Sequence, residues 1–166
     1  HKIPNFIEKA AQAGVRRVFI GLENINPDNL IAAKKRQNKI TEYRAMLQKW
    51  REYGAITYAG YIIGFPADTK ESIVRDIGII KRELPLDILE FFMLTPLPGS
   101  EDHKVLSQKG VWMDSDMNKY DTNHRVSHHS KMSDTEWEDA YRAAWHTFYT
   151  PEHVRTILRR SSRISS

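Results

Sequence analysis

The apolar residues of this chain follow two different spacings. Three segments contain largely apolar runs, at residues 16–23, where the run is Val18-Phe19-Ile20, and at residues 56–64 and 88–95. After the second run, apolar residues recur every three or four positions, at Ile73, Ile77 and Ile80. Continuous runs are typical of strands in a parallel sheet covered on both faces, whereas the wider spacing predicts an amphipathic helix. The alternation of strands and helices predicts an α/β fold with three adjacent parallel strands.

Glycine and polar capping residues mark the ends of the predicted helices. Gly14 and Gly54 each close a helix and lead into a strand. Asn26 stands directly before a proline, a pair that begins a helix. Either Asp68 or Thr69 is expected to act as the N-cap of one helical pattern, and Ser133 as the N-cap of another. These signals support a repeated helix-to-strand unit.

The character of the chain changes near residue 100. Residues 1–100 contain the three predicted strands, in three βα-type units. Residues 111–131 are polar and rich in histidine, which predicts a loop laid over a surface. Strong helical patterns follow this loop. We therefore expect residues 101–166 to form a loop and helical C-terminal extension.

Composition narrows the classes of function. With 166 residues the chain is expected to form one domain with a real core. There is no cysteine, which excludes disulfides and cysteine-ligated iron–sulfur clusters within this chain. A formal net charge of +4 does not favour nucleic acid as a partner. No apolar run is long enough to span a bilayer and no secretory signal opens the chain, so we expect no membrane association and a cytoplasmic location.

Several residues at the ends of the predicted strands are candidates for binding a small molecule. Glu23 ends the first strand, where a carboxylate at a parallel sheet projects into the site. Gly60 and Gly64 lie on the second strand, where glycine indicates a close approach by a ligand or by a packed side chain. Glu23 could instead serve as a favourable charge at the start of the following helix.

The remaining candidates lie outside strand interiors. Lys39 is placed to pair with a carboxylate, or is a solvated lysine in a basic run. Pro96 begins a rigid turn after the third strand, on which a flat apolar ligand could pack. His124 and His128 have the spacing of a metal-binding pair, but they lack a nearby glutamate or cysteine ligand. We expect these two histidines to contact a substrate and not a metal.

Four phrases in this order and spacing resemble the second half of a radical S-adenosylmethionine enzyme. More narrowly, they resemble the group whose longer members often carry a cobalamin-binding domain. The phrases are Phe19-Ile20-Gly21-Leu22-Glu23-Asn24, Gln37-Asn38-Lys39, the segment from Gly60 to Thr69, and Thr95-Pro96-Leu97-Pro98-Gly99-Ser100. The segment from Tyr120-Asp121 to His128, Met132-Ser133 and Phe148-Tyr149 also look like the C-terminal extension of that group. The resemblance therefore covers nearly the whole chain.

This resemblance implies a fold and a cofactor. The implied fold is the C-terminal half of a TIM-like partial (β/α)6 barrel, with residues 1–100 as the half-barrel. The implied cofactors are S-adenosylmethionine, a four-iron cluster held elsewhere in the intact enzyme, and in some members cobalamin. The residues implied to bind S-adenosylmethionine are Glu23, Lys39, Gly60, Ile62, Gly64, Thr95 and Pro96.

The missing cysteines set limits on this interpretation. The family's cluster-binding loop is absent here, so the chain alone is not expected to cleave S-adenosylmethionine reductively. We expect a fragment of a longer enzyme, whose partner is the missing N-terminal half of the barrel or a second associating chain, acting on a small-molecule substrate. One alternative is a non-catalytic half-barrel that assembles with a partner chain. Another is an ordinary α/β enzyme of the aldolase kind, although no strand carries the lysine that this would require.

Overall fold

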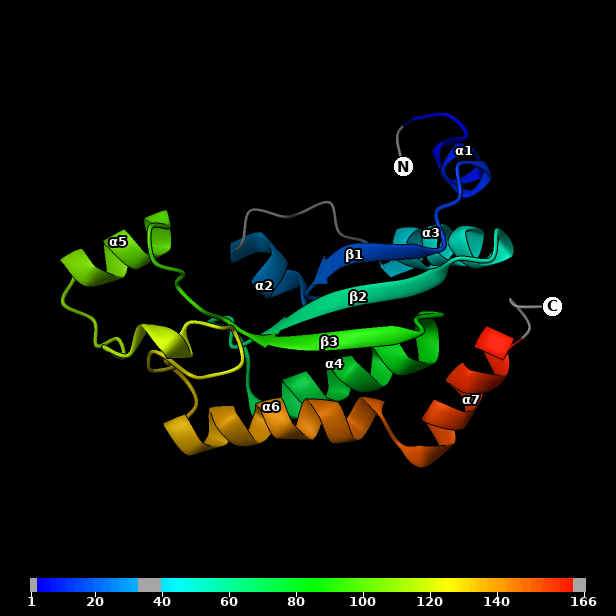
Figure 1. Cartoon of the computed structure of the whole chain (residues 1–166). Helices are drawn as coiled ribbons and strands as arrows, with labels where there is room; N and C mark the ends of the chain where they lie inside the picture. The colour runs from blue at the N-terminus through cyan, green and yellow to red at the C-terminus, as the bar shows by residue number, and fades with distance from the viewer. Residues whose placement is uncertain (1–2, 33–39, 163–166) are drawn as a thin grey trace.

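The structure is a computed structural model that describes residues 3–32 and 40–162 (Figure 1). Its centre is a three-stranded sheet in the order β1-β2-β3, with both neighbouring pairs parallel. The strands are β1 (Arg17–Glu23), β2 (Ile56–Ile63) and β3 (Ile88–Met93). The three parallel strands predicted from the apolar runs are confirmed, and the fold class is α/β.

Helices connect and extend the strands within the described ranges. They are α1 (Phe6–Gln12), α2 (Pro27–Ala32), α3 (Ile40–Glu52), α4 (Lys70–Glu83), α5 (Glu101–Gln108), α6 (Asp134–Phe148) and α7 (Pro151–Ser162), with a 3-10 turn at Met117–Lys119. Of the two candidate caps of α4, Thr69 is the N-cap and Asp68 is not, and the predicted cap Ser133 is confirmed. Thr69 and Ser133 each form a capping box with the residue three positions later. No helix in these ranges is long and apolar enough to cross a membrane.

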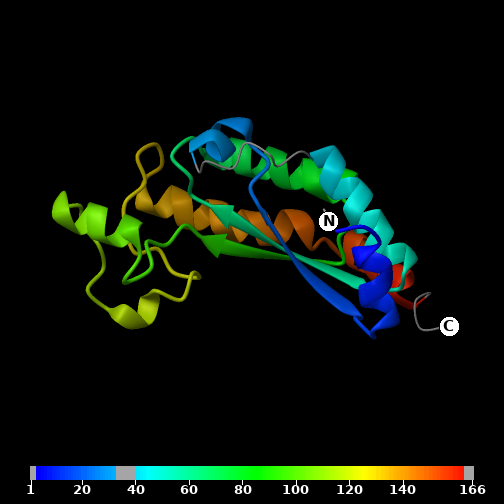
Figure 2. The same ribbon diagram turned by 90° about the horizontal axis from the view of Figure 1, so that it is seen from above.

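Helices cover only one face of the sheet in the part of the chain that the structure describes. Figure 2 shows α3, α4 and α6 on the same side of the strands, and no helix lies along the other side. The covered face carries buried residues such as Tyr61, Leu89 and Phe91. On the open face, Phe19 is 56% exposed and Ile88 is 42% exposed. The expectation of a sheet covered on both faces was wrong. The apolar residues on the open face include aromatic side chains that pack on one another, and such residues make a run apolar without a second layer of helices.

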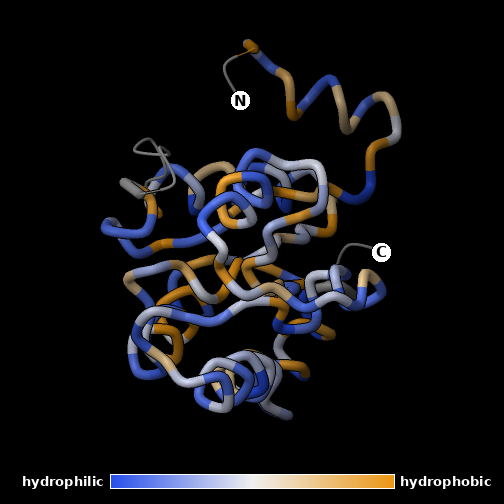
Figure 3. Tube along the Cα trace, turned by 90° about the vertical axis from the view of Figure 1, so that its left-hand side faces the viewer, coloured by the Kyte–Doolittle hydropathy of each residue, from blue (hydrophilic) through white to orange (hydrophobic). Residues whose placement is uncertain are grey.

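The hydrophobic core lies between the covered face and the helices. Ile73, Ile77 and Ile80 of α4 are fully buried, as their three-to-four spacing predicts. Trp137 and Phe148 of α6 join them. Figure 3 looks at the carboxyl ends of the strands and shows hydrophobic segments gathered in the middle of the molecule, with α1 standing apart.

Gly64 marks where α6 packs against the end of β2. Its φ is +108°, a region that side chains with a Cβ rarely adopt. A Cβ on Gly64 would lie 2.2 Å from the Trp137 ring. The Trp137 indole nitrogen also donates a hydrogen bond to the Ile63 carbonyl at 3.3 Å. The glycine therefore lets the indole pack directly on the backbone at the carboxyl end of β2.

The two outer edges of the sheet differ. On β3, the Tyr149 hydroxyl accepts a hydrogen bond from the Leu89 N–H and donates one to the Leu89 carbonyl, at 3.0 and 2.9 Å. The Met93 N–H donates to the Thr122 carbonyl at 2.7 Å. On β1, the outward backbone groups of Phe19 have no such cover among the described residues. The C-terminal extension thus covers the β3 edge at Leu89 and Met93, whereas the β1 edge is uncovered at Phe19 among the described residues.

Two glycine substitutions test this packing. We expect Gly64→Ala to lower the free energy of unfolding by on the order of 3 kcal/mol, because it combines a left-handed backbone with a clash against Trp137. Gly78→Ala is the matched control, since a Cβ there meets nothing within 4 Å and the position is inside α4. It should raise stability by about 0.5–1 kcal/mol. Urea denaturation measures both, and equal effects of the two substitutions would contradict the packing described.

Candidate functional site

Glu23 lies at the carboxyl end of β1, where the backbone changes direction. Its φ is +61°, and the pairing of β1 with β2 shifts register between Gly21 and Glu23. The Glu23 carboxylate lies over Gly21, because one of its oxygens would be 3.5 Å from a Cβ built there. The Tyr43 hydroxyl of α3 donates to the Gly21 carbonyl at 2.9 Å. Burial, and then the charge of Glu23, raise the pKa of Tyr43.

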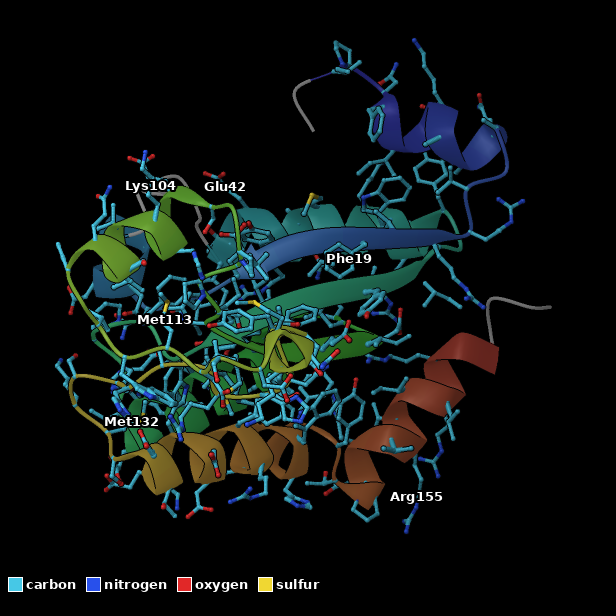
Figure 4. The ribbon with its side chains drawn as sticks, turned by 60° about the vertical axis from the view of Figure 1, so that its left-hand side comes forward. Phe19, Glu42, Lys104, Met113, Met132 and Arg155 are labelled. Atoms are coloured by element: carbon cyan, nitrogen blue, oxygen red, sulfur yellow. The ribbon has the colours of Figure 1, made fainter. Side chains whose placement is uncertain are left out.

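An aromatic group lies beside this carboxylate on the open face of the sheet. Phe19 packs edge-on against Tyr58, with ring centroids 4.8 Å apart. A Cβ on Gly60 would lie 2.7 Å from the Phe92 ring and 3.1 Å from Phe19. The Tyr58 hydroxyl donates to Glu90 on β3. Glycine at position 60 therefore lets two phenylalanine rings lie against the strand, and Figure 4 places Phe19 on β1.

A buried carboxylate holds together the loops that follow β1 and β2. One oxygen of Asp68 accepts from the Gly64 and Phe65 N–H groups, each at 2.9 Å. Its other oxygen accepts from the Asn29 side chain at 2.5 Å. Asn29 also donates to the side chain of Asn24, and all three polar side chains are almost fully buried. Burial nevertheless raises the pKa of Asp68, against the effect of these hydrogen bonds.

The C-terminal extension joins the same loops. A ring nitrogen of His129 lies 2.9 Å from the Phe65 carbonyl oxygen. The other ring nitrogen of His129 accepts from the Lys131 and Met132 N–H groups, both at 3.0 Å. His129 therefore connects the segment before α6 to the turn after β2.

A second buried acid lies under the sheet. Asp76 of α4 is 3% exposed, and one of its oxygens accepts from Arg75. Its other oxygen and the Tyr61 hydroxyl are buried without a hydrogen-bond partner in the structure. Burial is the largest cause that raises the pKa of Asp76. An ionised Asp76 is therefore costly in the folded protein.

A cavity of about 430 Å³ lies behind the end of β1. It is mainly apolar, and Tyr43 and Asn24 supply polar groups. Its other lining residues are Leu22, Ile25, Pro27, Ile40, Thr41 and Ile79.

The structure places the predicted cofactor residues in different surroundings. Glu23, Gly60 and Ile62 lie near the carboxyl ends of β1 and β2, and Lys39 falls outside the described residues. Gly64 faces the Trp137 ring and not open space. Thr95 donates to the Met93 carbonyl at 3.0 Å, and the neighbouring Pro96 is buried. The binding roles of these residues stay predictions.

The two predicted substrate histidines each lie beside an acid. His124 has a ring nitrogen 3.0 Å from both carboxylate oxygens of Asp121. His128 lies 2.9 Å from Asp134 and stacks on Trp112, with ring centroids 4.5 Å apart. No group of three or more potential metal ligands occurs in residues 3–32 and 40–162.

Sequence reasoning missed the residues that shape this site most. The aromatic group of Phe19, Tyr58 and Phe92 was seen only as part of apolar runs. Their alternation along each strand was available as a signal, because residues two apart share a face. Asp68 was considered only as a possible helix cap, and no local pattern indicates its bonds to Asn29.

No family model matches this chain. Among curated proteins, it is 27% identical to bacteriochlorophyllide d C-12(1)-methyltransferase of Chlorobaculum tepidum, over 129 residues that cover 78% of this chain and 28% of the relative. It is 26% identical to the C-8(2)-methyltransferase of the same organism, over 74% of this chain and 27% of the relative. It is 25% identical to an uncharacterized methyltransferase of Pyrococcus horikoshii, over 98% of this chain and 38% of the relative. The chain thus spans between about a quarter and two fifths of the length of these relatives.

These names correct the functional interpretation drawn from the sequence. All three relatives are named as methyltransferases, and none is named for radical cleavage, an iron–sulfur cluster or cobalamin. The assignment to radical S-adenosylmethionine enzymes, with its four-iron cluster and cobalamin, is contradicted by this finding. The assignment rested on short phrases that are weak singly, and a phrase that fits a cofactor's shape does not specify how the cofactor reacts.

The buried acid of α4 gives a pH-dependent prediction. Because burial raises the pKa of Asp76 above 3.8, this group favours the folded state most below pH 3.8. Its contribution is lost as the pH rises through the raised folded pKa. The stability of Asp76→Asn relative to the original protein should therefore rise with pH across this window and then level off.

Asp139→Asn is the matched control on the surface of α6. Arg142 donates to Asp139 and lowers the pKa of that carboxyl group. The relative stability of this variant should fall as the pH rises toward 3.8. Urea denaturation at a series of pH values measures both trends, and trends of the same sign would contradict the assignment.

Proposed function

We propose that this chain is part of a larger methyltransferase that uses S-adenosylmethionine as its methyl donor. The observation that carries the proposal is that three relatives named as methyltransferases align with 74–98% of this chain. Because the chain covers at most 38% of any of them, the full activity belongs to the longer protein.

The open face near Glu23 has groups that fit this cofactor. S-adenosylmethionine carries a cationic sulfonium, an ammonium group, ribose hydroxyls and a flat adenine. A carboxylate accepts hydrogen bonds from the hydroxyl or ammonium groups, and aromatic faces favour flat rings and cations. Glu23 lies at the same end of the sheet as Ile62 and Phe92, where β1, β2 and β3 finish. Gly21 adds room, because a Cβ there would meet only the Glu23 side chain within 4 Å.

The residues of this chain serve binding and orientation in the proposed reaction. When bound, S-adenosylmethionine supplies an electrophilic methyl group, which passes to a nucleophile of the acceptor and leaves S-adenosylhomocysteine. Glu23 fixes the position of the cofactor through its carboxylate. Phe19 and Phe92 keep water from one side of it. Holding the two reactants in line and away from water is the main contribution expected of such groups.

We also propose roles at this site for the other residues that the sequence suggested. Ile62 lies on the open face, and Gly60 contributes by letting the Phe19 and Phe92 rings lie against β2. Gly64 contributes through its packing on Trp137, which fixes the end of β2. Thr95 and Pro96 border the site at the end of β3, and Lys39 pairs with the cofactor's carboxylate. His124 and His128 lie in the C-terminal extension on the acceptor side.

The sheet is proposed to continue beyond β1 as part of a TIM-like partial barrel. The support is the contrast between the two edges, because β3 is covered by Tyr149 and Thr122, whereas the outward groups of Phe19 are not covered among the described residues. Helices on one face and an open apolar face on the other are what a barrel wall requires. The missing strands come from the rest of the longer protein or from a second chain.

Two substitutions test the cofactor site in the longer protein. Glu23→Gln should weaken S-adenosylmethionine binding by about 1–3 kcal/mol, because it removes a charged acceptor. Gly21→Leu should weaken binding without a loss of stability, because the leucine fills open space above β1. Isothermal titration calorimetry measures the affinity.

Glu71→Gln is the control, because Glu71 is an exposed glutamate in the first turn of α4. It should leave the affinity unchanged. If the substitutions at positions 21, 23 and 71 have equal effects, the site is rejected. If S-adenosylmethionine does not bind the unaltered longer protein, the proposed function itself is rejected.

Hydrogen exchange tests the continuation of the sheet. In this chain alone, the Phe19 amide should exchange quickly and the Leu89 amide slowly, because only the second has a partner on the outer edge. In the longer protein, the Phe19 amide should become protected. Rapid exchange at Phe19 in both proteins would show that no strand is added there.

A further inference from the structure

A polar groove lies between α4 and α7, away from the proposed methyl-transfer site. Its volume is about 310 Å³, which is near the lower limit for a small-molecule pocket. Its walls are formed by Gly78, Lys81 and Arg82 from α4, and by Thr150, His153 and Thr156 at the start of α7.

The groove depends on a glycine that packing does not explain. Gly78 lies inside α4, where glycine is less favourable than alanine because its backbone loses more conformational freedom. A Cβ at this position would meet nothing within 4 Å, and its φ is not positive. Neither a close contact nor an unusual backbone conformation therefore requires glycine here. Because Gly78 has no side chain, the groove stays open beside this turn of α4.

The groove is electropositive. The Lys81 ammonium group donates to the Thr147 carbonyl at 3.0 Å and to the Thr150 hydroxyl at 2.9 Å, which fixes it between α4 and α7. The Arg82 guanidinium is largely exposed and pairs with Glu83 at 3.1 Å. Glu152 is the one acidic residue in the lining, and it is exposed.

His153 is partly buried and lies near positively charged side chains. Burial, followed by the charges of Lys81 and Arg160, lowers the pKa of His153. The ring packs edge-on against Phe148, with centroids 4.7 Å apart. The groove therefore combines three basic side chains with two threonine hydroxyls, and an anion would relieve the repulsion among the basic groups.

We propose that this groove binds a phosphate group, either as free phosphate or as the phosphate of a small metabolite. Lys81 and Arg82 supply charged donors, and the Thr150 hydroxyl, which accepts from Lys81, supplies a neutral one. The Thr156 hydroxyl donates to the Glu152 carbonyl at 3.1 Å and lines the groove without donating to the anion. The site is separate from Glu23 and does not depend on the proposed methyl transfer.

Nuclear magnetic resonance of this chain tests the proposal, with inorganic phosphate as the probe. The pKa of His153 should rise by about one pH unit at saturating phosphate, because a bound anion stabilises the imidazolium. Sodium chloride at equal ionic strength should produce a much smaller change. Equal responses to the two salts, or no response to phosphate, would overturn the proposal.

Variants distinguish a specific phosphate site from a general effect of salt on the charges of the protein. Gly78→Leu fills the groove and should abolish the response, whereas Arg82→Gln should weaken it several-fold. Lys104→Gln is the control, because Lys104 on α5 lies at the far end of the molecule from α7 (Figure 4). If Arg82→Gln and Lys104→Gln have the same effect, the proposal fails even where Gly78→Leu disturbs folding.

A second arm identifies the source of the phosphate. Adenosine 5′-monophosphate is titrated in parallel with inorganic phosphate. Tighter binding of the nucleotide would support a phosphate-bearing metabolite, and equal binding would support free phosphate. Binding of neither would overturn the proposal.

Discussion

The carboxyl end of this sheet depends on the hydrogen bonds of one buried carboxylate, that of Asp68. It accepts from two backbone N–H groups after β2 and from Asn29 after β1, so one side chain fixes two loops. His129 then connects the C-terminal extension to the same turn. Because Asp68 is fully enclosed, its hydrogen bonds are not exchanged for water, and loss of one partner leaves a buried group unsatisfied. Asn29 also donates to Asn24, the residue after Glu23, so the same hydrogen bonds fix the backbone next to Glu23.

The one-sided covering of the sheet explains where a ligand has access. The helices bury one face, and the other face carries Phe19, Tyr58 and Phe92 around Gly60. These rings pack against each other and yet leave apolar surface exposed, which is typical of a surface that binds something. The strands that we propose would add beside β1, where the outward groups of Phe19 are uncovered among the described residues.

The comparisons and the geometry bear on different parts of the function. The relatives' names point to methyl transfer. The region that aligns with this chain is a minor part of each relative's own length. The geometry gives a carboxylate and aromatic groups at the ends of parallel strands, which suit binding and do not select a reaction. Because the sequence has no cysteine, this chain cannot itself supply thiolate ligands to an iron–sulfur cluster. The sequence phrases did not indicate the reaction for which the relatives are named, and the site that they suggested stays a prediction.

Local patterns in the sequence were enough to locate the three parallel strands and the starts of two helices. Apolar runs and capping boxes act locally, so Ser133 could be recognised from its neighbours, and the cap of α4 could be narrowed to Asp68 or Thr69. Which face of the sheet stays open, and what Gly60 and Gly64 contribute, depends on the tertiary packing. Gly64 serves the packing of Trp137, 73 positions later in the sequence, and Asp68 bonds to Asn29, 39 positions earlier. Such contacts depend on how distant segments meet, and no local spacing records that.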